Sequence, residues 1–368
     1  MTHEATTAND VAEPLVADRP VRERLVWVDA ARGYCVAAVV LFHVLLWRTS
    51  WGALTQDHVA WGFWGAVNQG LGSVRMPVLL AISGLVLSRQ ILEGLHRATT
   101  GFRAVSNYYI YVVWLVVYAV VSLFVAEPTL HHRVAGWGLL AQLFVPETTL
   151  WYVYALALYI PILALLRRAP VWLVLGVLTV LAIWVHVHDA DALALKAPGM
   201  FVFFAVGVYG NHRFRSLAAS ATWWRLAAAA AVAAGVTALG ALTTSELQDA
   251  VLFVPRGVAF VVVCVVAVAL AVRWRPVRVV GLALGRRTLG VYVQHPLWLA
   301  LLTGVAAGGG SGLVAVVLGD RWGALLFPLV ITGIVIGLSV AGQELAERAG
   351  LGVLFEMPAR WRRAFGRE

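Results

Sequence analysis

The sequence predicts an all-α membrane protein, a polytopic bundle of about ten transmembrane helices without a soluble domain. The chain has 368 residues, of which 61% are hydrophobic and only 13% are charged, and its mean hydropathy is +0.82. A soluble domain is about 45–50% apolar and about 25% charged, so most of this surface must face lipid. The 16 Trp and 10 Tyr residues fit the same class, because amphipathic rings collect at membrane interfaces.

Ten apolar stretches are long enough to cross a membrane, which takes about 20 helical residues. They lie at residues 25–47, 71–92, 106–126, 148–166, 171–187, 198–211, 224–242, 250–272, 288–306 and 322–343. The small residues at 227–234 are typical of a packed helix interface. We therefore expect one transmembrane domain over residues 25–343.

The two ends of the chain are more polar than this domain. Residues 1–24 lack the apolar core of a signal peptide, and we expect them to form a disordered cytoplasmic tail. Residues 344–368 combine arginines with apolar side chains such as Leu351, Phe355 and Trp361. This composition predicts a basic segment that lies on the anionic inner membrane surface and contacts lipid headgroups.

Basic residues predict the orientation. With the N-terminus inside, 22 of the 28 Lys and Arg residues fall on the cytoplasmic side, and the exceptions are Arg48, Arg75, Arg133, Lys196, Arg256 and Arg321. Because Lys and Arg favour cytoplasmic loops, both termini of this multi-pass cell-membrane protein should be cytoplasmic. The net charge of +9 follows from that bias and gives no argument for nucleic-acid binding, since the charges are divided among short loops.

Polar residues inside apolar spans are the best candidates for function, because their burial in lipid is expensive. The first span contains Asp29, Arg32 and His43. Asp29 and Arg32 share one helix face and could form an ion pair. Arg32 and His43 are within roughly 20° of the same face, with a rise of about 16 Å between them. A histidine at this depth can exchange protons near neutral pH, or it can bond to a neighbouring helix in a purely structural role.

The Arg32-x10-His43 pattern within VDAARGYCVAAVVLFHVLLW resembles the opening of the acyltransferase-3 family of integral membrane O-acyltransferases. Three further segments resemble family segments in the same order: GSVRMPVLLAISGLVLS at 72–88, TTLWYVYALALY at 148–159 and RRTLGVYVQHPLWLALL at 286–302. The resemblance covers residues 25–363, and ten helices is the family's number. Two departures are Met76-Pro77, in place of an aromatic pair, and the absence of a glutamate that many members carry near Ala155.

The resemblance implies transfer of an acyl group, usually acetyl, from cytosolic acyl-CoA to a hydroxyl of a glycan, a lipid-linked sugar or a small molecule. The CoA thioester, with acetyl-CoA as the expected one, is then a co-substrate rather than a permanently bound cofactor. His43 would act as general base or as acyl-carrying nucleophile. Arg32 would bind CoA phosphate, with Asp29 orienting it. Envelope carbohydrate is the expected acceptor class.

Several other residues have two interpretations. His295, which we place on the donor side, either contacts acyl-CoA or makes a polar contact at a helix start. Arg75 either snorkels to the outer interface or binds the acceptor. Trp151 is either an interfacial aromatic or a face for a sugar-like acceptor. Arg256 is expected to snorkel. The HVHDAD stretch at 186–191 and the pair His131 and His132 contain metal-ligand types, but a solvated loop explains both better, and no metal site is predicted.

A proton-coupled transporter or flippase is the alternative function, with Asp29, Arg32 and His43 as a relay. Against it, the sequence has neither an inverted repeat nor paired Gly/Pro-broken helices in its two halves. The two cysteines, Cys35 and Cys264, lie in apolar runs and are expected to act as small hydrophobic residues.

Overall fold

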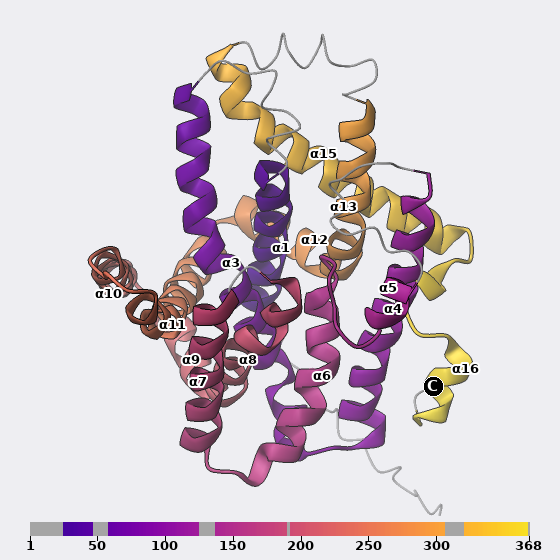
Figure 1. Ribbon diagram of the computed structural model, residues 1–368, viewed down its shortest axis with the longest axis horizontal. Coiled ribbons are helices and arrows are strands. Elements are labelled where there is room, and N and C mark those ends of the chain that lie inside the picture. Colours follow the sequence, from indigo (N-terminus) through magenta and orange to yellow (C-terminus); the bar gives the residue numbers. More distant parts are fainter. Residues whose placement is uncertain (1–24, 47–57, 125–136, 190–191, 306–319, 367–368) are drawn as a thin grey trace, which may run out of the picture.

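The computed structural model describes residues 25–46, 58–124, 137–189, 192–305 and 320–366 (Figure 1). Every regular element in these ranges is a helix, which confirms the predicted fold class. The longer helices are α1 Val26–Leu46, α3 His58–Glu93, α4 Phe102–Ser122, α6 Trp151–Leu165, α7 Val171–Asp189, α8 Leu193–Tyr209, α9 Asn211–Ala219, α10 Trp223–Ala241, α11 Glu246–Ala271, α12 Arg275–Arg286, α13 Thr288–Val305 and α15 Arg321–Arg348. Short elements are η1 Arg97–Gly101, α5 Trp137–Ala141, η2 Leu166–Arg168, η4 Gly352–Leu354 and α16 Ala359–Ala364. The expected tail 1–24 and Arg48, His131, His132, Arg133 and Asp191 lie outside the described residues.

All ten predicted spans correspond to helices. Within the described ranges, eight helices are long and apolar enough to cross a membrane, and α8 with α9 forms a further candidate that bends by 65°. The helix α13 has 18 residues but is not among these candidates. Its middle carries Gln294, His295 and Pro296, all of them buried by neighbouring helices. A helix enclosed by protein need not be apolar throughout, and hydropathy alone therefore does not define this span.

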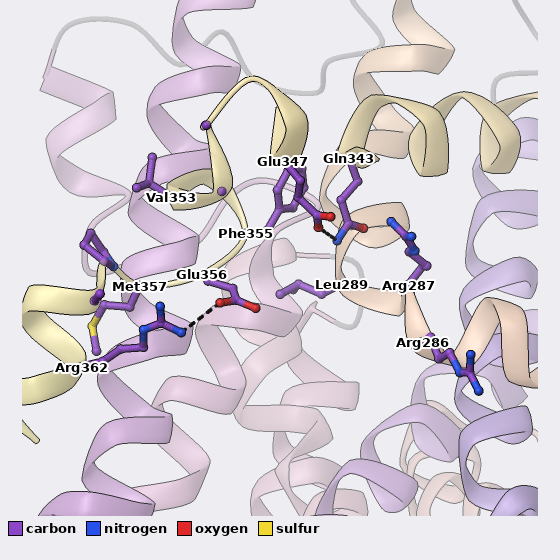
Figure 2. Close-up of a pocket in the computed structure, with 15 residues that line it drawn as sticks. Arg286, Arg287, Leu289, Gln343, Glu347, Val353, Phe355, Glu356, Met357 and Arg362 are labelled. Atoms are coloured by element: carbon purple, nitrogen blue, oxygen red, sulfur yellow. Dashed lines mark hydrogen bonds and ion pairs between the residues drawn. The ribbon is translucent and has the colours of Figure 1, made fainter. Parts of the chain in front are cut away.

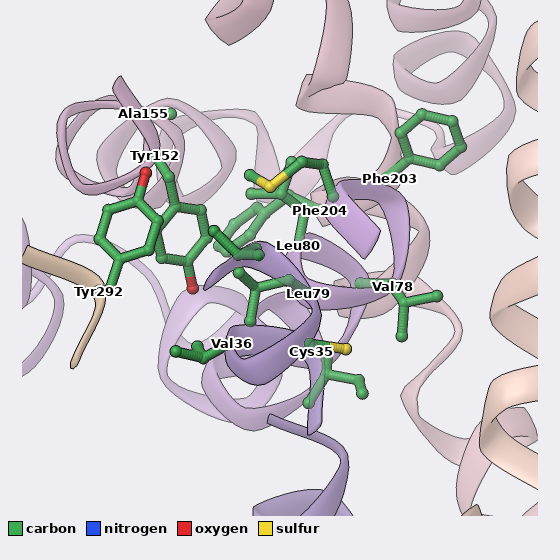
Figure 3. Packing of buried hydrophobic residues seen from close by; sticks show 14 of the residues in the cluster. Cys35, Val36, Val78, Leu79, Leu80, Tyr152, Ala155, Phe203, Phe204 and Tyr292 are labelled. Carbon is green, nitrogen blue, oxygen red and sulfur yellow. The ribbon is translucent and has the colours of Figure 1, made fainter. Parts of the chain in front are cut away.

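The core lies where α1, α3, α6 and α8 meet, and Figure 3 shows apolar side chains from these helices packed together, with Tyr152 and Tyr292 at one side of the cluster. The helices α3 and α8 are in backbone contact. A Cβ atom added to Gly84 would lie 2.1 Å from the Phe204 carbonyl oxygen, and one added to Gly207 would lie 1.9 Å from that of Ala81. Small residues permit this approach in membrane bundles, where van der Waals packing replaces the hydrophobic effect between helices.

Two segments at the edges of the bundle, α10 and the C-terminal segment, bear on the packing that the sequence predicted. The helix α10 lies at one edge beside α11 (Figure 1), and Ala233 is its one buried residue. Its small residues therefore pack against α11, while most of the helix surface stays exposed.

At the other edge, the C-terminal segment runs along α4 (Figure 1). Trp114 Nε1 donates to the Leu354 carbonyl at 2.7 Å, Tyr109 OH donates to that of Val353 at 2.9 Å, and Phe355 is buried against Trp114. Part of the expected membrane-surface segment thus packs on the bundle itself.

Candidate active site

Glycines on α12 bring the start of α13 to Arg32. A Cβ atom added to Gly285 would lie 2.2 Å from the Asp29 carbonyl oxygen, and one added to Gly281 would lie 2.7 Å from Ala30 Cβ. No larger residue fits between these two backbones. The helix α13 begins directly after this contact, and Arg32 Nη2 donates to Thr288 Oγ1 at 3.2 Å.

The ion pair that the sequence allows between Asp29 and Arg32 is not among the ion pairs of the described residues, and Arg32 bonds to Thr288 instead. Asp29 lines a cavity of about 830 Å³ beside Arg89 and Arg215. The Asp29, Arg32 and His43 residues therefore do not form one chain of contacts, because Arg32 and His43 each bond to a different residue of α13.

His43 and His295 lie side by side. The Nδ1 atom of His43 is 3.3 Å from the Nε2 atom of His295, and the ring centroids are 4.8 Å apart. His295 is fully buried, whereas His43 is partly accessible. Two parallel helices, α1 and α13, thus bring together residues that are far apart in the sequence.

The hydrogen bonds assign the tautomers of this pair. His43 Nδ1 is 2.8 Å from the Val39 carbonyl oxygen, and His295 Nδ1 is 2.7 Å from that of Tyr292. A carbonyl only accepts, so each Nδ1 carries a proton and donates it. His295 Nε2 then accepts a second, longer hydrogen bond from His43 Nδ1–H. In the neutral pair, His43 Nε2 is left with a lone pair and no proton.

This arrangement changes the role that the sequence suggested for His295. Its place soon after the start of its span suggested either a donor-side residue near the CoA nucleotide or a polar contact at a helix start. Seven residues of α13 separate it from Thr288, a rise of about 10 Å. It therefore lies well inside the bundle against His43 and cannot contact the same part of the donor as Arg32.

Tyrosines that we did not select as site residues hold the two histidines in place. The Tyr292 ring lies at 60° to the Tyr152 ring with the centroids 5.1 Å apart, and its hydroxyl donates to the Thr149 carbonyl. Tyr118 OH donates to the Val293 carbonyl at 2.9 Å. The start of α6 is thus fixed beside the middle of α13. Tyr292 lies three residues before His295 in the segment that resembles the family, and this position was the available sign in the sequence that Tyr292 belongs to the site.

Arg75 lies near His43 rather than at an interface. Its Cζ atom is 3.2 Å from the ring centroid of Phe42, the neighbour of His43. Its Nη1 atom is buried and has no hydrogen-bond partner among the described residues. One cation with a spare donor therefore lies near His43.

Trp151 does not present an aromatic face to solvent. Its side chain is 6% exposed and belongs to the apolar core. The N-terminal end of α6 lies beside Tyr292 instead of at a membrane interface, and this depth explains the difference from the interfacial position that we predicted.

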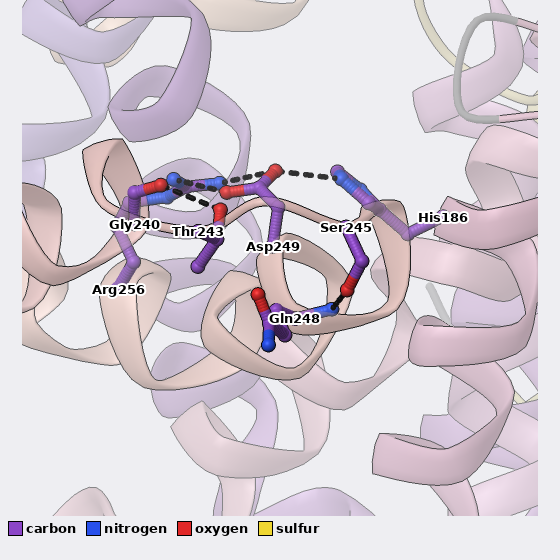
Figure 4. A network of polar contacts seen from close by, with 7 residues as sticks. All are labelled: His186, Gly240, Thr243, Ser245, Gln248, Asp249 and Arg256. Carbon is purple, nitrogen blue, oxygen red and sulfur yellow. Dashed lines mark hydrogen bonds and ion pairs between the residues drawn. The ribbon is translucent and has the colours of Figure 1, made fainter.

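His186 and Arg256 share one carboxylate, as Figure 4 shows. Asp249 Oδ2 is 3.1 Å from His186 Nε2, and Asp249 Oδ1 accepts from Arg256 Nη1 at 3.0 Å. Arg256 is therefore paired within the bundle and does not snorkel. This network links α7 to α11, and the described residues contain no cluster of three or more His, Cys, Asp or Glu side chains that could hold a metal.

Comparison with protein families decides the reaction class. Residues 25–343 match the family model described as an acyltransferase domain, that of the acyltransferase-3 family. The chain belongs to this family. It is accordingly a membrane acyltransferase, and the resemblance seen in the four sequence segments is confirmed. No curated protein and no solved structure matches the chain.

Proposed function

We propose that this acyltransferase-3 member is an O-acyltransferase. It moves an acyl group, with acetyl as the expected one, from cytosolic acyl-CoA to a hydroxyl of a glycan, a glycolipid or a small molecule. The observation that carries the proposal is the 2.8 Å contact between His43 Nδ1 and the Val39 carbonyl oxygen, which makes Nδ1 the donor and leaves the lone pair of the neutral ring on Nε2. A positioned base with a free lone pair is what hydroxyl activation needs.

In the first route, His43 is a general base. Its Nε2 takes the hydroxyl proton as the acceptor oxygen attacks the thioester carbonyl carbon. The tetrahedral intermediate then collapses, the carbon–sulfur bond breaks, and the leaving thiolate takes the proton back from Nε2. His295 Nε2 accepts from Nδ1–H throughout, and it stabilises the cationic imidazole while the proton is held.

In the second route, His43 is the nucleophile. The Nε2 atom attacks the thioester, CoA thiolate leaves, and the acyl group stays on the imidazole until the acceptor hydroxyl displaces it. Rapid quenching of the protein with acyl-CoA alone distinguishes the routes. An acyl adduct on the peptide that contains His43 indicates the nucleophile, and its absence during turnover indicates the base.

Two arginines have complementary roles in this proposal. Arg75 donates from its unpartnered Nη1 to the acceptor or to the negative oxygen of the intermediate, since this donor lies near His43 and is not satisfied elsewhere. Arg32 lies about 16 Å from His43 along α1, and it borders the path by which the donor would enter. The buried Trp151 supports the site from behind instead of contacting the acceptor.

We further propose that the donor enters from the cytoplasm and that the acceptor is acylated at the outer half of the cell membrane, where envelope carbohydrate is assembled. CoA is too polar to cross hydrocarbon, and the charge bias places the Arg32 end of α1 inside. Sealed, oriented vesicles test this, with acyl-CoA on the cytoplasmic side and an impermeant acceptor on the other. Product formed only when both substrates share the cytoplasmic side contradicts it.

The activity itself is tested with purified protein and acetyl-CoA, by following release of the CoA thiol with and without hydroxyl acceptors. His43→Ala should abolish transfer at normal expression, whereas His188→Ala, an exposed histidine stacked on Trp184, should not. Mass spectrometry of envelope glycans and lipids, with and without the protein, identifies the acceptor. Near-normal turnover by His43→Ala would show that His43 is structural.

A further inference from the structure

A second cavity lies at the start of α13 and shares no lining residue with the cavity that Asp29 lines. It has a volume of about 540 Å³ and is bounded by the end of α12, the first turn of α13, the last turns of α15 and residues 350–362 (Figure 2). Its walls therefore combine parts of the membrane bundle with the C-terminal segment.

Three arginines line this cavity, namely Arg286, Arg287 and Arg362. Arg362 pairs with Glu356 at 3.1 Å, and Arg287 Nη2 pairs with Glu344 at 2.9 Å. The Nη1 atom of Arg287 is nevertheless buried without a hydrogen-bond partner in the described ranges. Arg286 makes no ion pair among the described residues. The cavity thus offers guanidinium donors that the described part of the chain leaves unsatisfied, and planar guanidinium groups suit phosphate oxygens.

The position of the cavity connects it to the reacting pair. Leu289 and Gly290 line it and follow Thr288, to which Arg32 donates. His295 is five residues beyond Gly290 on the same helix, a rise of about 7.5 Å. A ligand with its charged end in the cavity and a thin arm directed along α13 would approach His43 and His295.

The C-terminal wall is fixed before any ligand binds. Val353 and Leu354 accept hydrogen bonds from α4, and Phe355 and Met357 are buried. A preformed wall lowers the cost of ordering on binding.

The cavity of about 830 Å³ that Asp29 lines is the other place where an anionic ligand could bind. Its basic residues include Arg89, which already pairs with Glu93 at 2.7 Å, and Arg215, and its wall contains the carboxylate of Asp29. Carboxylates do not separate the two cavities, because Glu347 and Glu356 line the smaller one. What favours the smaller cavity is that residues of α13, the helix that carries His295, line it, whereas α13 does not line the larger one.

We infer that the cavity at residues 286–290 and 350–362 binds the phosphate-rich nucleotide end of the acyl-CoA donor. This inference rests on the proposed function. It adds a role for the C-terminal segment, which becomes part of the donor site instead of only a membrane-surface element.

The test compares two donors with purified full-length protein. Acetyl-CoA carries the nucleotide, and S-acetyl-pantetheine has the same thioester arm without it. Arg286→Gln and Arg362→Gln should each raise the KM for acetyl-CoA about tenfold or more, because each loses a charge-assisted hydrogen bond. Both variants should use S-acetyl-pantetheine as the parent does. Arg360→Gln is the matched control, since Arg360 lies over Trp361 and does not line the cavity.

Equilibrium binding of adenosine 3′,5′-bisphosphate gives a measurement that does not require turnover. The parent and Arg360→Gln should bind it alike, and Arg286→Gln should bind it about tenfold more weakly. Unchanged binding in Arg286→Gln and Arg362→Gln, or weakened binding in Arg215→Gln of the larger cavity instead, overturns the inference. If the parent transfers from neither donor, the proposed function fails, and this binding series still decides where the nucleotide sits.

Discussion

Replacing His295 with Leu removes the acceptor for His43 Nδ1–H at nearly constant side-chain volume. His295 is fully buried, so a smaller residue would add the effects of a cavity to those of a lost hydrogen bond. Val39 still accepts from Nδ1 at 2.8 Å in the variant, and the tautomer of His43 should be preserved. The variant therefore reports on the contact between the two rings alone.

The expected loss is intermediate in size. The distance between the two nitrogens is 3.3 Å, which is long for a hydrogen bond between neutral rings. The bond gains strength when His43 becomes cationic, and hydrogen bonds to charged groups contribute about 1.5–3 kcal/mol. At 1.36 kcal/mol per tenfold in rate, kcat should fall by about ten- to hundredfold. Loss of the base itself in His43→Ala removes a contribution of about 10²–10⁴-fold.

The assay measures kcat and KM for acetyl-CoA separately. A positioning role for His295 predicts a lower kcat at unchanged KM, whereas the donor-binding role suggested by the sequence predicts the reverse. His295→Gln should recover part of the rate, because its amide oxygen can accept near the place of Nε2. If His295→Leu turns over like the parent, the contact between the two rings does not contribute to catalysis, and the positioning role of His295 is wrong.

Three further outcomes are expected. Arg32→Lys should raise the KM for acetyl-CoA about tenfold, because Lys lacks the planar fork, and equal rates at limiting donor would contradict this. Gly285→Ala should destabilise the protein by about 1–3 kcal/mol through the collision with Asp29, measured as thermal unfolding in detergent. Gly333→Ala is its control, since no atom lies within 4 Å of the added Cβ. A cytoplasm-dependent reporter fused to the C-terminus should be active, and activity only outside the cell would refute the topology.

The sequence was most informative where a property belongs to a single helix. Apolar length located all ten helices, and the 100° periodicity put Arg32 and His43 near one face of α1. It was less informative about which helices face lipid. The alanines of α10 can serve as an interface or be exposed to lipid with equal ease, and it is the position of α11 that decides which of them are packed.

The contact between His43 and His295 depends on a quantity that the sequence of neither helix contains, namely the axial offset between α1 and α13. Counting residues from each span's start put His295 at a shallower level than His43. The offset is set by α12, where Gly281 and Gly285 allow backbone contact with α1 and thereby place Thr288 level with Arg32. From that level, α1 advances eleven residues to His43 and α13 advances seven to His295, about 16 and 10 Å. The remaining difference is of the size that two imidazole side chains pointing toward each other can close. The pair therefore forms because three helices are in register, and substitutions at Gly281 or Gly285 should disturb the two histidines without contacting them.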